Sequence, residues 1–326
     1  MNAPRVFLAA FVCLGFAGST YAQSNEGPTK PWKQVRGFGR VLNLSNPPVV
    51  IDEPGLYAID RDWLIPRATT AVVTERIQIT ADDVTIDLHG FEISADTGFA
   101  PPGPSTLLVI SGRNAEVRNG GLTACCEGAR TVASTGFGTR LHHATMSSWE
   151  RMTFDAGGAV TDSDIGLTVS MRFGEGVTVE RNTIRCNRGL RCVELLGDGN
   201  RVTDNYLNLQ QGGGIDIVGN GNFVANNVIE ARDAPDAAEA FEVEGDSNVV
   251  RGNTLVLSGN VRNPFFVISG TANTIDGNIA APGERQGIGM EFRADGNFYG
   301  NNRIAADVPF SLGGTVQTDW GGNVGY

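Results

Sequence analysis

The sequence predicts an all-β chain folded as a right-handed parallel β-helix of about eleven three-strand coils with an N-terminal cap. Three observations predict this fold. An asparagine returns at a nearly regular interval between apolar anchors, the segments around it alternate apolar and polar residues with period two, and no interval has the pattern of an amphipathic helix. The 43 glycines are spread along the chain, which indicates many turns rather than one disordered block.

The first residues are typical of a secretory signal peptide. Arg5 precedes an apolar run over residues 6–16, and "STYA" places the cleavage after Ala22. The apolar run is too short to span a bilayer as a helix, so we expect a soluble protein that is secreted or periplasmic. The expected parts are a signal peptide (1–22), an N-terminal segment and cap (23–75) and the parallel β-helix (76–326).

The chain is acidic, with 36 acidic against 25 basic residues and a formal net charge of −11. Signal cleavage removes Arg5 and no acid, so the mature charge is −11 − 1 = −12. This balance argues against nucleic acid or an anionic membrane as a partner. The only lysines are Lys30 and Lys33, so a cationic catalyst within the β-helix must be an arginine or a metal ion.

The repeat is clearest in "VTDNYL" (202–207), which fits the pattern V-x-x-N-x-[ILV]. Ser163 and Ala144 occupy the asparagine position in two earlier units. The recurring asparagines are Asn182, Asn205, Asn227, Asn253, Asn278, Asn302 and Asn323.

We interpret the recurring asparagine as structural. A tight turn between two strands needs a residue that tolerates left-handed or bridge geometry, and asparagine does. Stacked about 4.8 Å apart, such side chains can form a hydrogen-bonded ladder. Leucine-rich repeats also carry a recurrent asparagine, but here the anchors are mostly Val and Ile and the connections are glycine-rich.

Beyond the repeat, three segments resemble a known family: "PGLYAIDRDW" (54–63), "IQITADDVTIDLHGFEI" (77–93) and "VRNGGL" (117–122). They are similar to the opening coils of secreted bacterial right-handed β-helix proteins of the pectin-lyase-like superfamily, over about residues 40–326. The superfamily includes lyases, glycoside hydrolases, epimerases and non-catalytic surface proteins, so the resemblance implies the fold and leaves the activity open. It also implies a cleft over the first strand of each coil, beside the variable loops.

Alignment of the repeats predicts which residues of that first strand point outward. The first outward column is Ser170, Glu194, Asp216, Glu242, Val267 and Glu291. The second is Leu196, Val218, Glu244, Ser269 and Arg293. Apolar residues alternate with the first column throughout, as expected for strands with one buried face.

The first column places carboxylates on successive coils about 4.8 Å apart. Stacked like charges are unfavourable, so solvent, a raised pKa, a nearby arginine or a hard cation must compensate. We expect catalytic residues among Glu194, Asp216, Glu242, Glu291 and Arg293. If the cation is calcium, its ligands are Asp216, Glu242 and Glu244. A solvated acidic stripe without catalytic function is the competing interpretation.

Four cysteines remain after signal cleavage. Cys186 and Cys192 lie in one loop, and we expect them to form a disulfide in an oxidising compartment. Cys125 and Cys126 lie about three coils away, too far to pair with them. Whether those two form a vicinal bridge or stay free is left open.

Two functions fit the sequence. The first is a secreted enzyme acting on a carbohydrate polymer, by β-elimination of a uronate or by hydrolysis with two carboxylates. The second is a non-catalytic solenoid that binds glycans or serves at the cell surface. The carboxylate column favours the first, and the scarcity of lysine favours the second.

Overall fold

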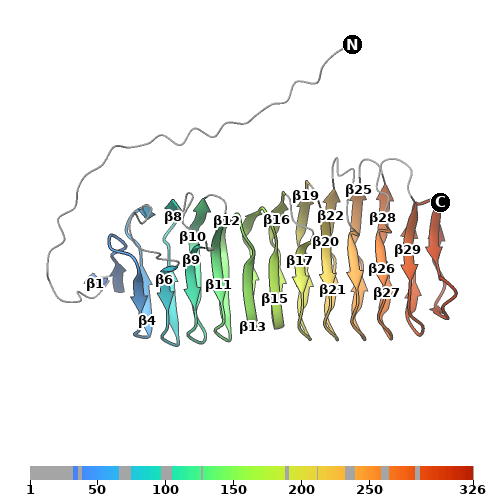
Figure 1. Cartoon of the computed structure of the whole chain (residues 1–326), viewed down its shortest axis with the longest axis horizontal. Coiled ribbons are helices and arrows are strands. Elements are labelled where there is room, and N and C mark those ends of the chain that lie inside the picture. The colour runs from blue at the N-terminus through green and yellow to red at the C-terminus, as the bar shows by residue number, and fades with distance from the viewer. Residues whose placement is uncertain are drawn as a thin grey trace, which may run out of the picture. The chain divides into compact units, whose positions relative to one another are not determined.

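The chain from residue 49 onward winds through successive coils of three strands, each coil hydrogen-bonded in parallel to the next (Figure 1). The computed structural model describes residues 32–35, 39–65, 75–96, 105–125, 128–187, 191–210, 212–231, 239–257, 264–282 and 287–325. Within these ranges it contains strands and no helix. The chain divides after Lys30, and the β-helix belongs to the second unit, Pro31–Tyr326.

The coils stack into three parallel sheets, which we call A, B and C in the order the chain visits them. Sheet A consists of β3 (Val49–Ile51), β6 (Glu75–Ile79), β9 (Ser105–Ile110), β11 (Ala129–Ser134), the first parts of β13 (Met152–Thr161) and β15 (Met171–Glu180), β17 (Arg191–Leu195), β20 (Gly213–Ile217), β23 (Phe241–Val243), β26 (Phe266–Ile268), β29 (Ile288–Phe292) and β32 (Val308–Ser311). Twelve coils are therefore described, close to the predicted eleven.

Sheets B and C follow the same order. Sheet B consists of β4 (Gly55–Ala58), β7 (Val84–Asp87), the first parts of β10 (Glu116–Cys125) and β12 (Thr139–Ser148), the second parts of β13 and β15, β18 (Arg201–Thr203), β21 (Phe223–Ala225), β24 (Val249–Arg251), β27 (Thr274–Asp276), β30 (Phe298–Gly300) and β33 (Thr318–Asp319). Sheet C consists of β5 (Trp63–Ile65), β8 (Glu92–Asp96), the second parts of β10 and β12, β14 (Asp164–Leu167), β16 (Thr183–Cys186), β19 (Tyr206–Leu209), β22 (Val228–Ala231), β25 (Thr254–Leu257), β28 (Ile279–Pro282), β31 (Arg303–Ile304) and β34 (Val324–Gly325).

The solenoid begins earlier than the boundary at residue 76 that we expected. β3, β4 and β5 already pair in parallel with β6, β7 and β8, so residues 49–65 form the first coil. Before it, β1 (Trp32–Val35) and β2 (Gly39–Leu42) form an antiparallel hairpin, and β2 adds to β4 in parallel. The hairpin covers one strand edge at this end, as a cap must. The expected signal peptide lies outside the described residues.

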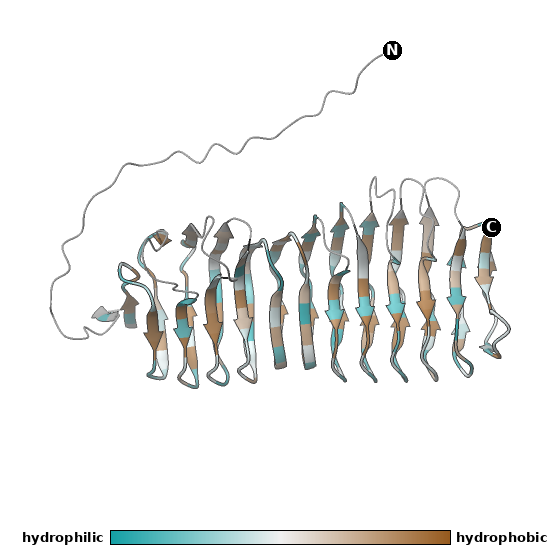
Figure 2. Ribbon diagram, viewed as in Figure 1, coloured by the Kyte–Doolittle hydropathy of each residue, from teal (hydrophilic) through white to brown (hydrophobic). Residues whose placement is uncertain are grey.

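The core is the column of side chains that point inward from each strand. In sheet A, the residues on either side of the predicted carboxylate column are all fully buried: Val193, Leu195, Ile215, Ile217, Phe241, Val243, Phe266, Ile268, Met290 and Phe292. The Phe241 and Phe266 rings stack on successive coils with their centroids 5.0 Å apart. Figure 2 shows the alternation along the strands as apolar and polar bands. Each buried side chain of this size contributes about 1.5–3 kcal/mol by leaving water.

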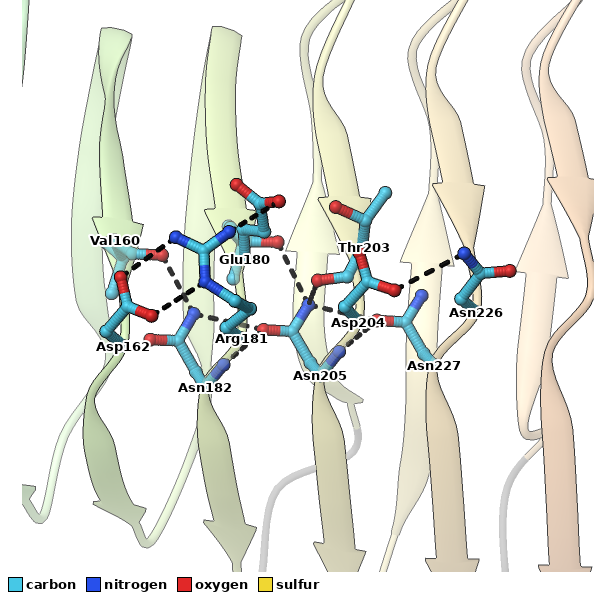
Figure 3. A network of polar contacts seen from close by, with 11 residues as sticks. Val160, Asp162, Glu180, Arg181, Asn182, Thr203, Asp204, Asn205, Asn226 and Asn227 are labelled. Atoms are coloured by element: carbon cyan, nitrogen blue, oxygen red, sulfur yellow. Dashed lines mark hydrogen bonds and ion pairs between the residues drawn. The ribbon is translucent and has the colours of Figure 1, made fainter.

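The predicted asparagine ladder is present at the corner between sheets B and C (Figure 3). The amide N–H of Asn182 donates to Oδ1 of Asn205 at 2.9 Å, and that of Asn205 donates to Oδ1 of Asn227 at 3.0 Å. The ladder continues to Asn323, and in the other direction Ser163 donates its N–H to Asn182. The recurrent asparagine therefore satisfies buried turn amides.

One part of our explanation was wrong, because the ladder asparagine is not the residue with positive φ. That conformation belongs to the residue before it, such as Arg181 (φ 54°), Asp204 (φ 58°) and Asn226 (φ 57°). Left-handed geometry is therefore needed one position earlier, where Asp, Asn and Gly recur. The ladder asparagine itself is selected for its buried hydrogen bonds.

A second buried ladder, which the sequence analysis missed, lies at the corner between sheets A and B. Asn200 donates its N–H to Oδ1 of Asn222 at 2.7 Å, and Asn222 donates to Asn248 at 2.8 Å. The repeated turn that carries it is visible in the sequence as "GDGN" (197–200), "GNGN" (219–222), "GDSN" (245–248) and "GTAN" (270–273).

The first glycine of this turn permits the close approach of successive coils. A Cβ on Gly219 would lie 2.0 Å from the carbonyl oxygen of Gly197. We therefore expect Gly219→Ala to force the coils apart and to cost about 1–3 kcal/mol, measured as a lower melting temperature. Gly221→Ser is the control, because Ser247 already occupies the equivalent positive-φ position and a Cβ on Gly221 meets no atom within 4 Å. Equal melting of both variants would contradict the close-packing argument.

Candidate active site

Sheet A carries the predicted carboxylates on one face in the predicted register. Glu194 pairs with Asp216 across β17 and β20, and Asp216 pairs with Glu242 across β20 and β23. Val267 and then Glu291 follow on the next two coils. Period-two alternation aims all of them away from the core.

Ser170 does not occupy the position predicted for it, and this is a correction. The residue beside Glu194 in the column is Arg172, because Met171 and Phe173 are the inward residues of β15 and Met171 pairs with Val193. Ser170 lies just before β15, buried at the corner where the chain enters sheet A. The predicted outward position was two residues too early.

Glu194 is an ionised anchor surrounded by donors. The Ser170 hydroxyl donates to its Oε1 at 2.7 Å, and Arg172 donates to its Oε2 from Nε at 3.1 Å and from Nη2 at 2.9 Å. Nη2 of Arg151 lies 3.0 Å from Oε1. Burial alone would raise the pKa of Glu194, but the bonds from Ser170 and Arg172 and the charge of Arg151 outweigh it and hold the pKa low.

Asp216 has the opposite environment. Its Oδ1 is buried and accepts no hydrogen bond, and its Oδ2 lies 4.0 Å from Nε of Arg191. Burial is the largest cause that raises the pKa of Asp216, Arg191 opposes it, and the negative charges of Glu242, Glu244 and Glu194 add to it, so that the pKa is about 6. Asp216 can therefore hold a proton under mildly acidic conditions, while Glu194 cannot.

Arg191 supplies the positive charge that the stacked carboxylates need. Its Nη2 lies 3.1 Å from Oε2 of Glu239 and also pairs with Oε2 of Glu242. Burial would lower the pKa of Arg191, but the bond to Glu242 and the charges of Glu242, Glu239 and Asp216 raise it above the ordinary value. The arginine is thus fixed as a cation beside Asp216.

The sequence analysis did not place Arg151, Arg172 or Glu239 in the site. A signal for Glu239 exists, since it precedes Glu242 by three residues as Arg191 precedes Glu194. Equal offsets from the same column put Arg191 and Glu239 at the same edge of sheet A. The alignment places these residues at the same edge but does not show which side chains form ion pairs there.

Glu291 and Arg293 lie on the same face but belong to a separate contact. Nη2 of Arg293 donates to Oε2 of Glu291 at 2.7 Å. Val267 separates Glu291 from Glu242, a distance of two strand spacings or about 10 Å. The catalytic role expected for Glu291 and Arg293 remains a prediction. At this distance from Glu242, the two residues can more directly contact a long ligand.

An aliphatic surface borders the carboxylates on the second outward column. Leu196 and Val218 are each 41% exposed, and they follow Glu194 and Asp216 by two residues. Glu244 continues the column and is exposed to solvent. The face therefore presents an apolar strip beside the charged cluster, a combination suited to a sugar ring with its C–H and hydroxyl faces.

Calcium binding by Asp216, Glu242 and Glu244 remains a prediction. In the described part of the chain, no three carboxylate, histidine or cysteine side chains are grouped to hold a metal ion. Oε2 of Glu242 is engaged by Arg191, and Glu244 faces solvent. The guanidinium of Arg191 supplies a positive charge beside Glu242 and Glu239.

We expect millimolar calcium, compared with a chelator, to leave the melting temperature unchanged, because Arg191 already neutralises Glu242 and Glu239. Differential scanning calorimetry in both buffers measures this. A calcium-dependent rise in melting temperature that is lost in Glu242→Gln would instead support the predicted calcium site.

Cys186 and Cys192 form the disulfide between the end of β16 and the start of β17, with their Cα atoms 5.7 Å apart. Both residues are fully buried. Cys126 and the side chain of Cys125 lie outside the described residues, so their pairing is not addressed.

These features define the class of protein: a right-handed parallel β-helix with a charged site on one face of its coil stack. Residues 161–316 match the family described as right handed beta helix region. The resemblance to right-handed β-helix repeat proteins is thus confirmed. No helix in the described ranges is long and apolar enough to cross a membrane.

Two solved structures are similar to the chain. One is the A-module of the mannuronan C-5 epimerase AlgE6 of Azotobacter vinelandii, 12% identical, with a TM-score of 0.46 over 84% of this chain and 91% of that chain. The other is a mutant tailspike protein of E. coli bacteriophage HK620 in complex with a pentasaccharide, 12% identical, with a TM-score of 0.39 over 79% of this chain and 65% of that chain. No curated protein matches the sequence.

Proposed function

We propose that this protein hydrolyses a carbohydrate polymer bound across sheet A, with Asp216 as the proton donor and Glu242 as its ionised partner. The observation that carries the proposal is the unequal environment of the stacked carboxylates. Asp216 has a buried oxygen without a partner and a pKa of about 6, while Glu194 and Glu242 are paired with arginines. Acid and base roles are commonly divided between carboxylates in this way.

The spacing supports a retaining mechanism. Asp216 and Glu242 are paired on adjacent strands, whose backbones lie about 4.8 Å apart. Side chains that extend in parallel from these strands match the carboxyl separation of roughly 5–5.5 Å at which the second carboxylate acts as the nucleophile. Asp216 protonates the glycosidic oxygen as the bond to the anomeric carbon breaks, and Glu242 bonds to that carbon. Water then hydrolyses the ester, giving its proton to Asp216 and releasing Glu242.

The remaining residues have supporting roles in this proposal. Glu194 holds the guanidinium groups of Arg151 and Arg172 and keeps a negative charge beside Asp216. Leu196 and Val218 offer an aliphatic surface to a sugar ring, and the pair Glu291 and Arg293 contacts the polymer two coils further on. We also propose export to an oxidising compartment, in agreement with the disulfide and the expected signal peptide.

A second function, glycan binding without catalysis, has one observation in its favour. Glu194 and Glu242 are each neutralised by arginine, an arrangement that also serves to stabilise a surface. In that case Asp216 would only be a carboxylate crowded by its neighbours. Binding and turnover therefore have to be measured separately.

The test is a panel of neutral and uronate-containing polysaccharides incubated with the mature protein, with and without calcium. We expect new reducing ends without unsaturated products, and a much lower yield of reducing ends with Asp216→Asn. Unsaturated products would replace hydrolysis with β-elimination. Binding of a polymer without either product would establish the glycan-binding function instead.

A further inference from the structure

We propose that the Cys186–Cys192 disulfide is a positioning device that holds Arg191 against Asp216 and Glu242. Its catalytic meaning rests on the function proposed above, whereas the contacts themselves do not. The bond joins the last residue of β16 to the second residue of β17, and Arg191 is the first residue of β17. Arg191 therefore lies directly beside the cross-link.

The neighbouring coils indicate that a disulfide is not needed to close a coil at this corner. The residues in register with Cys186 on the other coils are apolar residues of sheet C. The residues in register with Cys192 are small or polar and lie where the chain enters sheet A. The residues in register with Cys186 are Leu167, Leu209 and Ala231. Those in register with Cys192 are Ser170, Gly214 and Ala240. The cross-link is thus specific to the coil that carries Arg191.

Arg191 places a positive charge beside several acidic side chains, which explains why a disulfide fixes its position. Asp216 faces the acidic residues Glu194 on the preceding coil and Glu242 and Glu244 on the following one. Arg151 and Arg172 pair with Glu194, whereas Arg191 is the arginine beside Asp216, with its Nε 4.0 Å from Oδ2 of Asp216. An arginine at the end of a loop loses conformational entropy when it forms an ion pair. If the disulfide already fixes the backbone of Arg191, the entropy lost on pairing with the acids is smaller.

Two constraints act on the Arg191 backbone. On one side, Arg191 pairs with Gly213 in the parallel ladder. On the other, the adjacent Cys192 is fixed by the bond to Cys186, inside the core. Removal of the bond leaves only the ladder at the first position of the strand, where strands fray most easily. We therefore expect Arg191 to leave Asp216 part of the time.

The test is the titration of the Asp216 carboxyl, followed by NMR, in Cys186→Ala/Cys192→Ala. This pair copies the coil two steps further on, which has Ala231 and Ala240 at the equivalent positions. We expect the pKa of Asp216 to rise by about 0.5–1 pH unit, since an opposite charge is withdrawn. Arg191→Gln, with the disulfide intact, should raise it at least as much.

Arg185→Gln is the matched control, because Arg185 flanks the same loop but pairs with Asp164 and should leave Asp216 unaffected. If the alanine pair does not fold, Cys186→Leu/Cys192→Gly repeats the test with the residues of Leu209 and Gly214. A folded double variant with an unchanged Asp216 titration overturns the proposal, as does an unchanged titration in Arg191→Gln.

The titration needs no substrate, so its outcome is independent of the proposed function. A raised pKa in a protein that cleaves no polymer would uphold the positioning role and overturn the hydrolysis proposal. Turnover of a polymer together with an unchanged Asp216 titration would uphold the hydrolysis proposal and overturn the positioning role.

Discussion

Asp216→Asn is expected to lower turnover by about 10²–10⁴-fold on any polymer that the wild-type protein cleaves, the range that general acid catalysis contributes. The amide cannot donate the proton that the leaving oxygen needs. Wild-type activity should fall as pH rises through about 6, because the pKa of Asp216 marks where the donor loses its proton. Initial rates of reducing-end release from pH 4 to pH 8 measure both effects.

The same substitution should raise stability at high pH. Burial raises the pKa of Asp216 from 3.8 to about 6, so the native state binds this proton more tightly than the unfolded state does. The contribution of this proton to the free energy of unfolding is complete below pH 3.8 and is lost as the pH rises through 6. The gap of about two pH units corresponds to on the order of 3 kcal/mol, as an upper estimate.

We therefore expect Asp216→Asn to melt at a higher temperature than wild type at pH 8 and at a similar temperature at pH 4. Asp307→Asn, at an exposed position, is the control and should change neither melting nor turnover. Full activity of Asp216→Asn with the wild-type pH profile would rule out Asp216 as the acid.

Asn227→Leu should cause the largest loss of stability. Oδ1 of Asn227 accepts hydrogen bonds from N and Nδ2 of Asn205, and its Nδ2 donates to the carbonyl oxygens of Val202 and Ala225. The residue is fully buried. Leucine leaves these groups unpaired in a dry corner, at about 1–3 kcal/mol for each group that finds no new partner.

We expect the melting temperature to fall on the order of 10 °C, given roughly 2–4 °C per kcal/mol for a protein of this size class. Asn208→Leu makes the same chemical change on an outward position of β19 and should melt close to wild type. Below its melting transition, Asn227→Leu should retain turnover, because the ladder lies at the far corner from sheet A. Wild-type melting of Asn227→Leu would show that the ladder bonds are dispensable.

The coil and its register could be predicted from the amino-acid sequence alone. Apolar and polar residues alternate with period two on the strands, and where the turn asparagine marks the same point of successive coils the repeats align in only one way. This is why Glu194, Asp216, Glu242, Val267 and Glu291 were placed correctly in one column. The disulfide loop followed from the short separation of Cys186 and Cys192.

Register was less certain where the repeat pattern weakens. β13 and β15 run from sheet A into sheet B without a break, so these coils lack the turn that ends the sheet A strand in the later coils. The alignment therefore slipped by two residues and missed Arg172. The second ladder, with Asn200 and Asn222, was equally periodic but lay in a turn that we interpreted only as a connection.

The three-dimensional arrangement of the side chains was needed to find which carboxylate has a raised pKa. Glu194, Asp216 and Glu242 are equivalent in the repeat, and their difference comes from arginines on other coils and at the loop ends. Arg151 and Arg172 close on Glu194, Arg191 closes on Glu242, and Oδ1 of Asp216 is left without a donor. Each long arginine side chain can reach several acidic residues. Burial and side-chain rotamers decide which of them it pairs with, and an alignment of strands contains neither.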